Sequence, residues 1–392
     1  MEIQFWYCGV LPNTNIKNTI EKIDNTILFK NIYIDEIDPS KLNFLVLLLE
    51  TEWTNSSNPS VAHTHTSEFM GLMVKLQRNN FYFMLDNSGE AELWVDGLSS
   101  KFFDLLNKNK IEFNRLIVIN NDSSKIGLNK TRYGNFILNT CFFPNFFLST
   151  YDQMNGYIGE VNINKEIKPD KKFLCLNRRM NFQKYQIIEE LFNKGLLKDT
   201  RFTWVQNSVP SNKICKELIL EHNIDIDDFK SIQLEGDVMY GSDLSRNDEF
   251  LFTINPNWYY KSKVNIITET MLYKNSIHLT EKTWKAIYLG IPFVIYSPSR
   301  YYLKTLRDMG FKTFNSVINE DYDNILGNDK ITQIINGAEE LVTIYNTPEV
   351  LEICKFNQEL YFNFEHRKRI YKEYFLNKIY DVQNLTNSKT LI

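Results

Sequence analysis

The sequence predicts an α/β protein with two Rossmann-like domains that face each other across a cleft, followed by a helical C-terminal segment. Three observations support this prediction. Short apolar runs alternate with longer amphipathic stretches, as in βα units around parallel sheets. The alternation starts again near Lys172 after a polar stretch, residues 162–170, which we interpret as a linker. From about residue 330 the apolar residues change to helical spacing.

In the first half, short runs rich in apolar and aromatic residues predict buried strands. These runs are residues 3–8, 44–49, 81–85, 115–119 and 135–138. Two stretches with an apolar face predict helices, at residues 67–77 and 99–107. We therefore place an N-terminal Rossmann-like domain at residues 1–165.

The second half repeats this arrangement. A strand at residues 172–176 precedes a helix at residues 182–194, and Gly195 ends the helix because glycine readily adopts the left-handed conformation. Further apolar runs predict strands at residues 203–206, 250–254, 263–268 and 292–296. A second Rossmann-like domain therefore occupies residues 170–345. Residues 346–392 are expected to form helices that pack back across the domains.

Composition restricts the class of protein. The chain has 392 residues, of which 43% are hydrophobic and 23% are charged, as in globular proteins. This length exceeds that of a typical domain with a single hydrophobic core. Its net charge of -4 provides no overall basic field for nucleic acid or anionic membranes. The five cysteines stand singly, which favours a reduced, cytoplasmic location. The most apolar run, residues 42–49, is too short for a membrane span of about 20 residues.

Residues 263–295 carry the clearest functional pattern. A predicted strand ends before Glu269, and after a loop Thr280 precedes an amphipathic helix that begins with Glu281 and Lys282. Thr280 is a suitable N-cap, and a helix N-terminus attracts phosphate groups. Lys282 could then pair with a diphosphate, while Glu269 or Glu281 accepts ribose hydroxyls. A capped helix with solvated charges explains the same pattern without a ligand.

The order of these residues resembles the donor-site motif of α-1,3-fucosyltransferases, in which a strand ending in Glu-Asn-Ser is followed by Thr-Glu-Lys. Here Glu269 matches the first glutamate and residues 280–282 match the second motif, whereas residues 270–271 depart from Asn-Ser. Residues 303–323 resemble uncharacterised phage-type proteins of the glycosyltransferase kind. The resemblance covers about residues 170–345 well and the first half only weakly. It implies that residues 1–165 bind the acceptor and that residues 170–345 bind the nucleotide-sugar donor.

This resemblance implies a glycosyltransferase of the GT-B type that transfers a hexosyl or pentosyl group from a nucleoside diphosphate sugar. It implies no permanently bound cofactor and no metal. In the fucosyltransferases an asparagine and an arginine follow the first strand of this half. By that match Arg178, Arg179 or Lys184 would pair with the donor diphosphate, although an arginine pair at the surface is the simpler explanation.

Sugar transfer also needs a group that accepts the proton of the acceptor hydroxyl. Glu90 is our first candidate for this general base, because it follows the predicted strand at residues 81–85. Asp86, in the same turn, and His65 are the alternatives. The turn between Asp86 and Glu90 also has ordinary turn chemistry. His63 and His65 form an H-x-H pair, but the nearby sequence supplies no further metal ligands.

The acceptor is open at this point: a glycan, a protein or a modified DNA base. One rival is a phage-type DNA glycosyltransferase that acts on a modified base, and another is a non-catalytic binding protein that keeps the fold. Asp225 and Asp227 form a D-x-D pair like that of manganese-dependent sugar transferases, but they lie in an acidic turn that we interpret as solvated. The sequence has no dinucleotide fingerprint, P-loop or nucleophile elbow.

Overall fold

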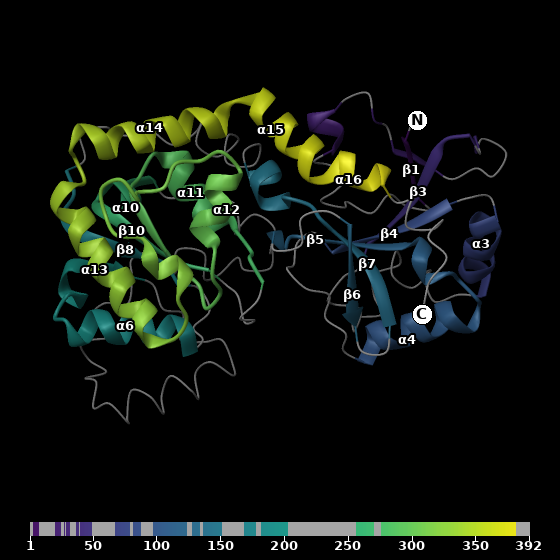
Figure 1. Ribbon diagram of the computed structural model, residues 1–392, viewed down its shortest axis with the longest axis horizontal. Coiled ribbons are helices and arrows are strands. Elements are labelled where there is room, and N and C mark those ends of the chain that lie inside the picture. Colours follow the sequence, from purple (N-terminus) through teal and green to yellow (C-terminus); the bar gives the residue numbers. More distant parts are fainter. Residues whose placement is uncertain are drawn as a thin grey trace. The chain divides into compact units, whose positions relative to one another are not determined.

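The structure is a computed structural model with two compact units (Figure 1). It describes residues 3–7, 20–24, 27, 29–31, 37–38, 40–48, 67–78, 81–87, 97–123, 128–133, 136–150, 168–177, 182–202, 256–269 and 276–381. Unit 1 comprises Met1–Ser149 and Phe364–Ile392, and unit 2 comprises Thr150–Asn363. Much of the linker expected at residues 162–170 lies outside the described residues, and the domain boundaries inferred from the sequence stay a prediction.

Within the described residues, unit 1 contains one sheet with the strand order β2-β1-β3-β4-β5-β7-β6. Its strands are β1 (Ile3–Tyr7), β2 (Phe29–Asn31), β3 (Leu42–Leu48), β4 (Phe81–Asn87), β5 (Leu116–Asn120), β6 (Leu128–Tyr133) and β7 (Phe136–Phe142). Neighbouring strands are parallel except β6 and β7, which are antiparallel. Every residue of β5 is buried, as expected for a parallel strand in the middle of a covered sheet.

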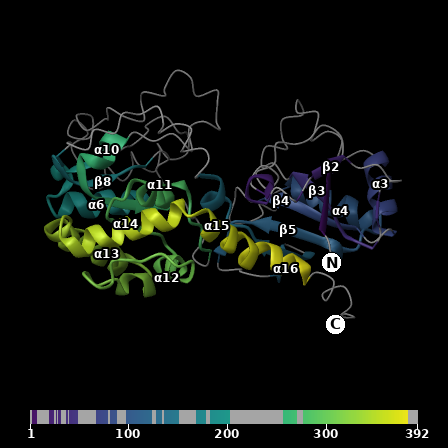
Figure 2. The same cartoon turned by 90° about the horizontal axis from the view of Figure 1, so that it is seen from above.

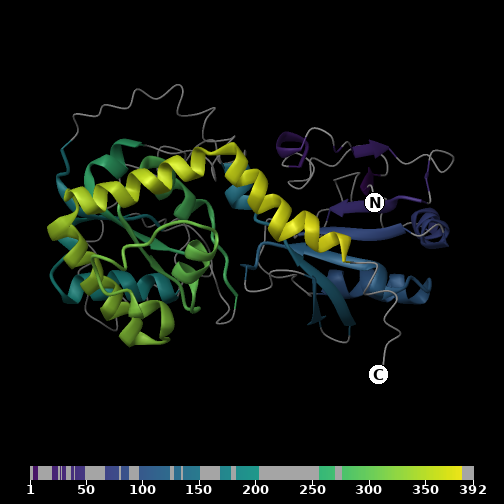
Figure 3. The same cartoon turned by 45° about the horizontal axis from the view of Figure 1, so that its top comes forward.

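Two helices of unit 1 pack on this sheet, α3 (Ser67–Arg78) and α4 (Gly97–Lys108). Met73 of α3 and Phe103 of α4 belong to one buried cluster with Leu85 and Val118 of the central strands. The C-terminal elements of unit 1 are α15 (Phe364–Tyr371), a π-helical segment η8 (Lys372–Leu376) and α16 (Asn377–Tyr380). Phe375 contacts Phe143, just after β7, with ring centroids 4.8 Å apart, and Figure 3 shows this yellow segment against the strands.

Unit 2 contains a second, fully parallel sheet with the strand order β11-β10-β8-β9 among the described residues. Its strands are β8 (Lys171–Cys175), β9 (Thr200–Phe202), β10 (Ser262–Thr268) and β11 (Phe293–Tyr296). Its helices are α6 (Phe182–Asn193), α10 (Pro256–Tyr260), α11 (Glu281–Leu289), α12 (Tyr302–Asp308), α13 (Asn328–Ile344) and α14 (Pro348–Phe362). α14 packs against α11, and α13 packs against α6 (Figures 1 and 2). Short 3₁₀ turns lie at Phe113–Arg115, Leu197–Asp199 and Asp321–Asn324.

Helix α11 is held firmly between its sheet and α14. Trp284 is buried and stacks on Tyr361 of α14, with ring centroids 6.0 Å apart. Gln358 donates a 2.7 Å hydrogen bond from Nε2 to the carbonyl oxygen of Tyr288, one of the carbonyls that a helix end leaves without an intrahelical partner. Gly290 then ends the helix with a φ of 65°, in the left-handed region that glycine tolerates.

The predicted α/β class, with parallel sheets and a helical C-terminal segment, is confirmed. The structure also contains strands that the sequence did not predict. β2 has three residues, and β6 is an edge strand of mainly polar residues, so neither gives a strong apolar signal. β9 precedes the strand expected at residues 203–206, which lies outside the described residues, as does the one expected at 250–254. None of the described helices has the length and apolar character needed to cross a membrane.

Candidate functional site

The sheet of unit 2 has a topological switch point between β8 and β10. β8 is followed along the chain by α6 and then β9 on one side, whereas β10 is followed by α11 and then β11 on the other. The connections leave the two central strands in opposite directions, and open α/β sheets bind ligands outside the carboxyl ends of such strands. Asn177 lies two residues past β8, and Glu269 directly follows β10. The switch point therefore defines the candidate site.

Glu269 ties the end of β10 to the first turn of α11. Its carboxylate accepts hydrogen bonds from the backbone N–H of Thr280 at 3.0 Å and from the Thr280 hydroxyl at 2.5 Å. The Thr283 hydroxyl donates a third bond of 2.7 Å. Burial raises the pKa of the Glu269 carboxyl, against the opposing effects of Lys282 and the two threonine hydroxyls. Both oxygens are therefore engaged, and Glu269 fixes the position of the helix N-terminus.

Thr280 is the N-cap of α11, as its place in the sequence predicts. Its hydroxyl accepts from the backbone N–H of Lys282 at 3.4 Å and from the Lys282 ammonium at 3.2 Å. It also donates to Glu269, so the one hydroxyl links the strand end, the helix cap and the lysine. The first turn of α11 consequently presents Lys282 in a fixed position beside the helix N-terminus.

Glu281 and Lys282 form an ion pair with Nζ and Oε1 3.2 Å apart. Burial disfavours both charges, but the neighbouring charges and hydrogen bonds together outweigh this effect. The pKa of Lys282 is accordingly raised, with Glu281 and Glu269 as the causes that overcome burial. The pKa of Glu281 is lowered, with Lys282 and Lys285 as the causes that overcome burial. Both residues are charged at neutral pH.

Lys184 on α6 belongs to the same group of charges. It is buried, and burial together with the nearby charge of Lys282 lowers the pKa of its ammonium group to about 7, although Glu281 and Glu269 act in the opposite direction. A buried lysine gains from an anion that replaces its lost hydration. The structure thus brings Lys184, Glu269, Thr280, Glu281 and Lys282 together at one end of the unit 2 sheet.

Two buried residues at this end were not among the site residues inferred from the sequence. Asn177 accepts a short hydrogen bond from the Thr268 hydroxyl, and its amide donates to the sulfur of Cys175 at 3.3 Å. The backbone N–H of His278 donates to the hydroxyl of Tyr302 at 3.0 Å, and burial lowers the pKa of the His278 imidazole to about 4. A polar residue just beyond the end of a buried strand is the signal that could have indicated Asn177.

The other sequence-derived candidates fall in different places. Arg178, Arg179, His65 and Glu90 lie outside the described residues. Asp86 belongs to unit 1, where it is buried near the carboxyl end of β4. The D-x-D pair of the sequence, residues 225–227, also lies outside the described part of the chain. Among the described residues, no group of three or more His, Cys, Asp or Glu side chains could hold a metal ion.

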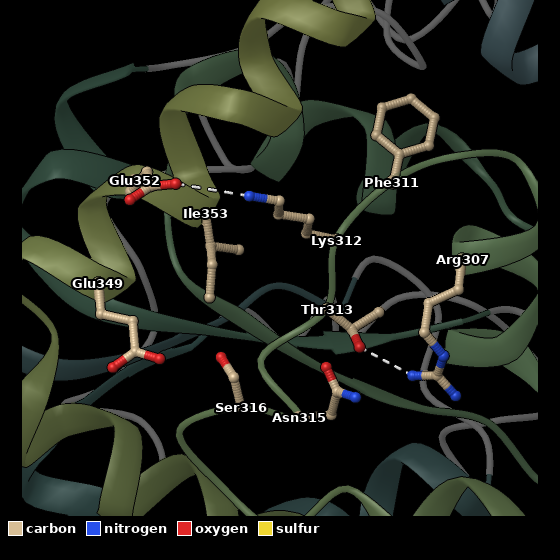
Figure 4. Close-up of a pocket in the computed structure, with 9 residues that line it drawn as sticks. All are labelled: Arg307, Phe311, Lys312, Thr313, Asn315, Ser316, Glu349, Glu352 and Ile353. Carbon is tan, nitrogen blue, oxygen red and sulfur yellow. Dashed lines mark hydrogen bonds and ion pairs between the residues drawn. The ribbon is translucent and has the colours of Figure 1, made fainter.

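A separate pocket of about 470 Å³ lies elsewhere in unit 2 and contains none of the site residues inferred from the sequence (Figure 4). It is lined by Arg307, Phe311, Lys312, Thr313, Asn315, Ser316, Glu349, Glu352 and Ile353. Arg307 is paired with Glu320 at 3.1 Å, and Lys312 is paired with Glu352 at 3.5 Å. The basic groups of this pocket therefore have anionic partners, as Lys282 at the switch point has in Glu281.

Neither a family model nor a curated protein sequence matches the chain. Solved structures with distant likeness include α,α-trehalose 6-phosphate synthase from Burkholderia multivorans, with a TM-score of 0.35 and 8% identity over 90% of this chain and 74% of that one. An E. coli structure described as trehalose-6-phosphate bound with UDP-2-fluoro glucose has a TM-score of 0.39 and 11% identity, over 97% and 99% of the two chains. The UDP-forming trehalose-phosphate synthase of Burkholderia vietnamiensis gives 0.36 and 9%, over 89% and 75%. Similarity this distant carries no argument about function, which we therefore infer from the geometry of the site.

Proposed function

We propose that the chain is a glycosyltransferase that takes a sugar from a nucleoside diphosphate sugar bound at the switch point of unit 2. One observation carries the proposal. The N-terminus of α11 is fixed by Glu269 and Thr280 at the carboxyl end of β10, with Lys184 and Lys282 in the same group of charges. A helix N-terminus with two lysines beside it has the chemistry of a diphosphate site.

In this proposal Lys282 and Lys184 pair with the diphosphate of the donor. Arg178 and Arg179, which follow β8 in the sequence, are further candidates for the same role. Glu281 is a better acceptor than Glu269 for hydrogen bonds from the ribose hydroxyls, because the oxygens of Glu269 already accept three hydrogen bonds. Glu269 then acts as a positioning residue for the helix that meets the diphosphate.

The reaction breaks the bond between the sugar C1 and the diphosphate and forms a bond from C1 to the acceptor oxygen. Negative charge develops on the departing nucleoside diphosphate, and the lysines at the helix N-terminus would stabilise that charge. The acceptor loses its proton to a general base, for which Glu90 is our first candidate and Asp86 and His65 are the alternatives. The proposal requires neither a resident cofactor nor a metal.

Titration of the full chain with UDP-, GDP- and dTDP-sugars, each by calorimetry, tests the donor site. We expect one nucleotide class to bind, and we expect the same donor to release its nucleoside diphosphate when a glycan mixture is added. Binding without release of nucleoside diphosphate under any acceptor condition would indicate a binding protein that keeps the fold. Absence of binding across all three classes would contradict the proposal.

A further inference from the structure

Buried polar side chains gather at the carboxyl end of the unit 1 sheet, where β4, β5 and β7 lie side by side. Asn120 ends β5, and Asn121 and Asp122 follow it; all three are almost completely buried. Asp86, near the end of β4, is opposite Ile119 in the parallel register and is also buried. We call Asp86, Asn120, Asn121 and Asn145 the polar edge of unit 1.

Several amide atoms of the polar edge lack hydrogen-bond partners within the described part of the chain. These are Nδ2 of Asn120, Nδ2 of Asn121 and Oδ1 of Asn145, which lies three residues past β7. An unsatisfied buried polar group costs about 1–3 kcal/mol, and folded proteins leave few of them. Three such atoms near neighbouring strand ends therefore indicate that something else supplies their partners.

A buried amide elsewhere in the same unit shows the contrast. Asn43 donates from Nδ2 to the carbonyl oxygens of Asp38 at 2.9 Å and Lys41 at 3.1 Å. Its Oδ1 accepts from the indole N–H of Trp6 at 2.8 Å. Asn43 lies near the start of β3 and satisfies its hydrogen bonds internally. The unmet amide atoms of Asn120, Asn121 and Asn145 lie instead at the sheet edge where α/β folds bind ligands, whereas Oε1 of Gln4, which is also unmet, lies within β1.

The positions of Asn120 and Asn121 indicate which class of ligand could bind at the polar edge. Asn120 is the last residue of β5 and Asn121 is the next residue, so both border the carboxyl end of this strand. Amide N–H groups donate to hydroxyl oxygens, and the carbonyl oxygen of Asn145 accepts from a hydroxyl. Ligands with adjacent hydroxyls satisfy donors and acceptors at once. The buried carboxylates of Asp86 and Asp122 at the same edge disfavour a polyanion.

We propose that the polar edge of unit 1 binds a hydroxyl-rich ligand of the sugar class, with Asn120 and Asn121 donating and Asn145 accepting hydrogen bonds. Its role as the acceptor site rests on the proposed glycosyltransferase function. In that role it makes the acceptor a sugar or glycan, rather than a base within a polyanionic DNA duplex. The binding itself requires no nucleotide and can be measured alone.

The test uses ligand-detected NMR and calorimetry on the full chain, with methyl hexosides and hexose disaccharides as probes and a DNA duplex as the alternative. We expect sugar binding by the parent and about tenfold weaker binding by Asn120→Ala and Asn121→Ala, the loss of one hydrogen bond. Asn107→Ala, which removes an exposed amide of α4, is the matched control and should leave the affinity unchanged. Asn120→Ser serves as a second variant, because a serine hydroxyl can still accept the 3.3 Å bond that the N–H of Asp122 donates to Asn120.

Thermal unfolding of each variant separates binding from folding. Removal of an unsatisfied Nδ2 group should by itself leave the melting temperature unchanged or higher, but Asn120→Ala also removes the acceptor of the Asp122 N–H, a loss that Asn120→Ser avoids. Equal sugar affinity in parent and variants would overturn the proposal. It would also be overturned if none of the proteins bound a sugar, even with saturating UDP or GDP, or if they bound only the DNA duplex. Nucleotide binding is recorded in the same proteins. Sugar binding without nucleotide binding would reject only the proposed donor site. Nucleotide binding without sugar binding would reject only the proposed sugar site at the polar edge.

Discussion

Thr283 and Glu269 are joined by a 2.7 Å hydrogen bond from the Thr283 hydroxyl to Oε1 of Glu269. Both side chains are buried, and the bond connects the first turn of α11 to the end of β10. A hydrogen bond to a charged or partly charged acceptor contributes more than a neutral one. This bond is therefore part of what holds the N-terminus of α11 at the switch point.

Replacing Thr283 with valine keeps the shape of the side chain and removes the donor. We expect Thr283→Val to lower the free energy of unfolding by about 1.5–3 kcal/mol, measured by urea denaturation. Thr332→Val is a matched control, since the exposed Thr332 hydroxyl donates to Glu190 at 3.1 Å between α13 and α6. The control should change stability by less than about 0.5 kcal/mol. Equal effects of the two variants would show that the buried bond has no special importance.

Loss of the Glu269 carboxylate should affect both stability and ligand binding. Glu269→Ala leaves three donors without an acceptor, and we expect a loss of about 3 kcal/mol or more in unfolding free energy. Glu320 is a similar buried glutamate of unit 2, which accepts from Thr313 at 2.6 Å and from the N–H of Phe314 at 2.8 Å. Glu320→Ala should destabilise comparably but leave nucleotide-sugar affinity unchanged. If both variants, or neither, weaken nucleotide-sugar binding under conditions where they are folded, Glu269 is not a positioning residue.

The buried Lys184 predicts a specific dependence of stability on pH. Its pKa is about 7 in the folded protein and near 10.5 in the unfolded chain. Between these values the unfolded chain holds the extra proton, so the stability contributed by Lys184 rises with pH. Lys184→Met should therefore be more stable than the parent at pH 7 and below, with the difference shrinking as the pH approaches about 10. Urea denaturation of both proteins between pH 7 and 10 measures this difference in unfolding free energy. A difference that stays constant with pH would contradict the lowered pKa of Lys184.

Glu90 is the least constrained assignment and has a direct kinetic test. If Glu90 is the general base, Glu90→Gln should lower turnover by about 100- to 10,000-fold while donor affinity is retained. Glu112→Gln, at an exposed carboxylate of unit 1 that pairs with Arg115, is the control. Near-normal turnover of Glu90→Gln would move the assignment to Asp86 or His65.

Local patterns predicted the elements of the site better than its connections. Thr280 as an N-cap and Gly290 as a helix end follow from residues close in sequence. The bonds from Thr280 and Thr283 to Glu269 depend on how β10 and α11 pack, which no local pattern contains. The lowered pKa of Lys184 likewise arises because tertiary packing buries its ammonium group and brings it near Lys282 of α11. Tertiary packing, not local sequence, determines these features.

Lys282 provides the most direct measurement of the proposed donor site. Its side chain is one-fifth exposed in the first turn of α11, whereas Lys355 on α14 is largely exposed, with 74% of its side chain accessible. Calorimetry with the nucleotide sugar that the parent binds should show Lys282→Ala weaker by about 2–4 kcal/mol, roughly 30- to 1000-fold. Lys355→Ala should bind like the parent. If folded Lys282→Ala binds the nucleotide sugar as tightly as the parent, the diphosphate does not lie at the N-terminus of α11.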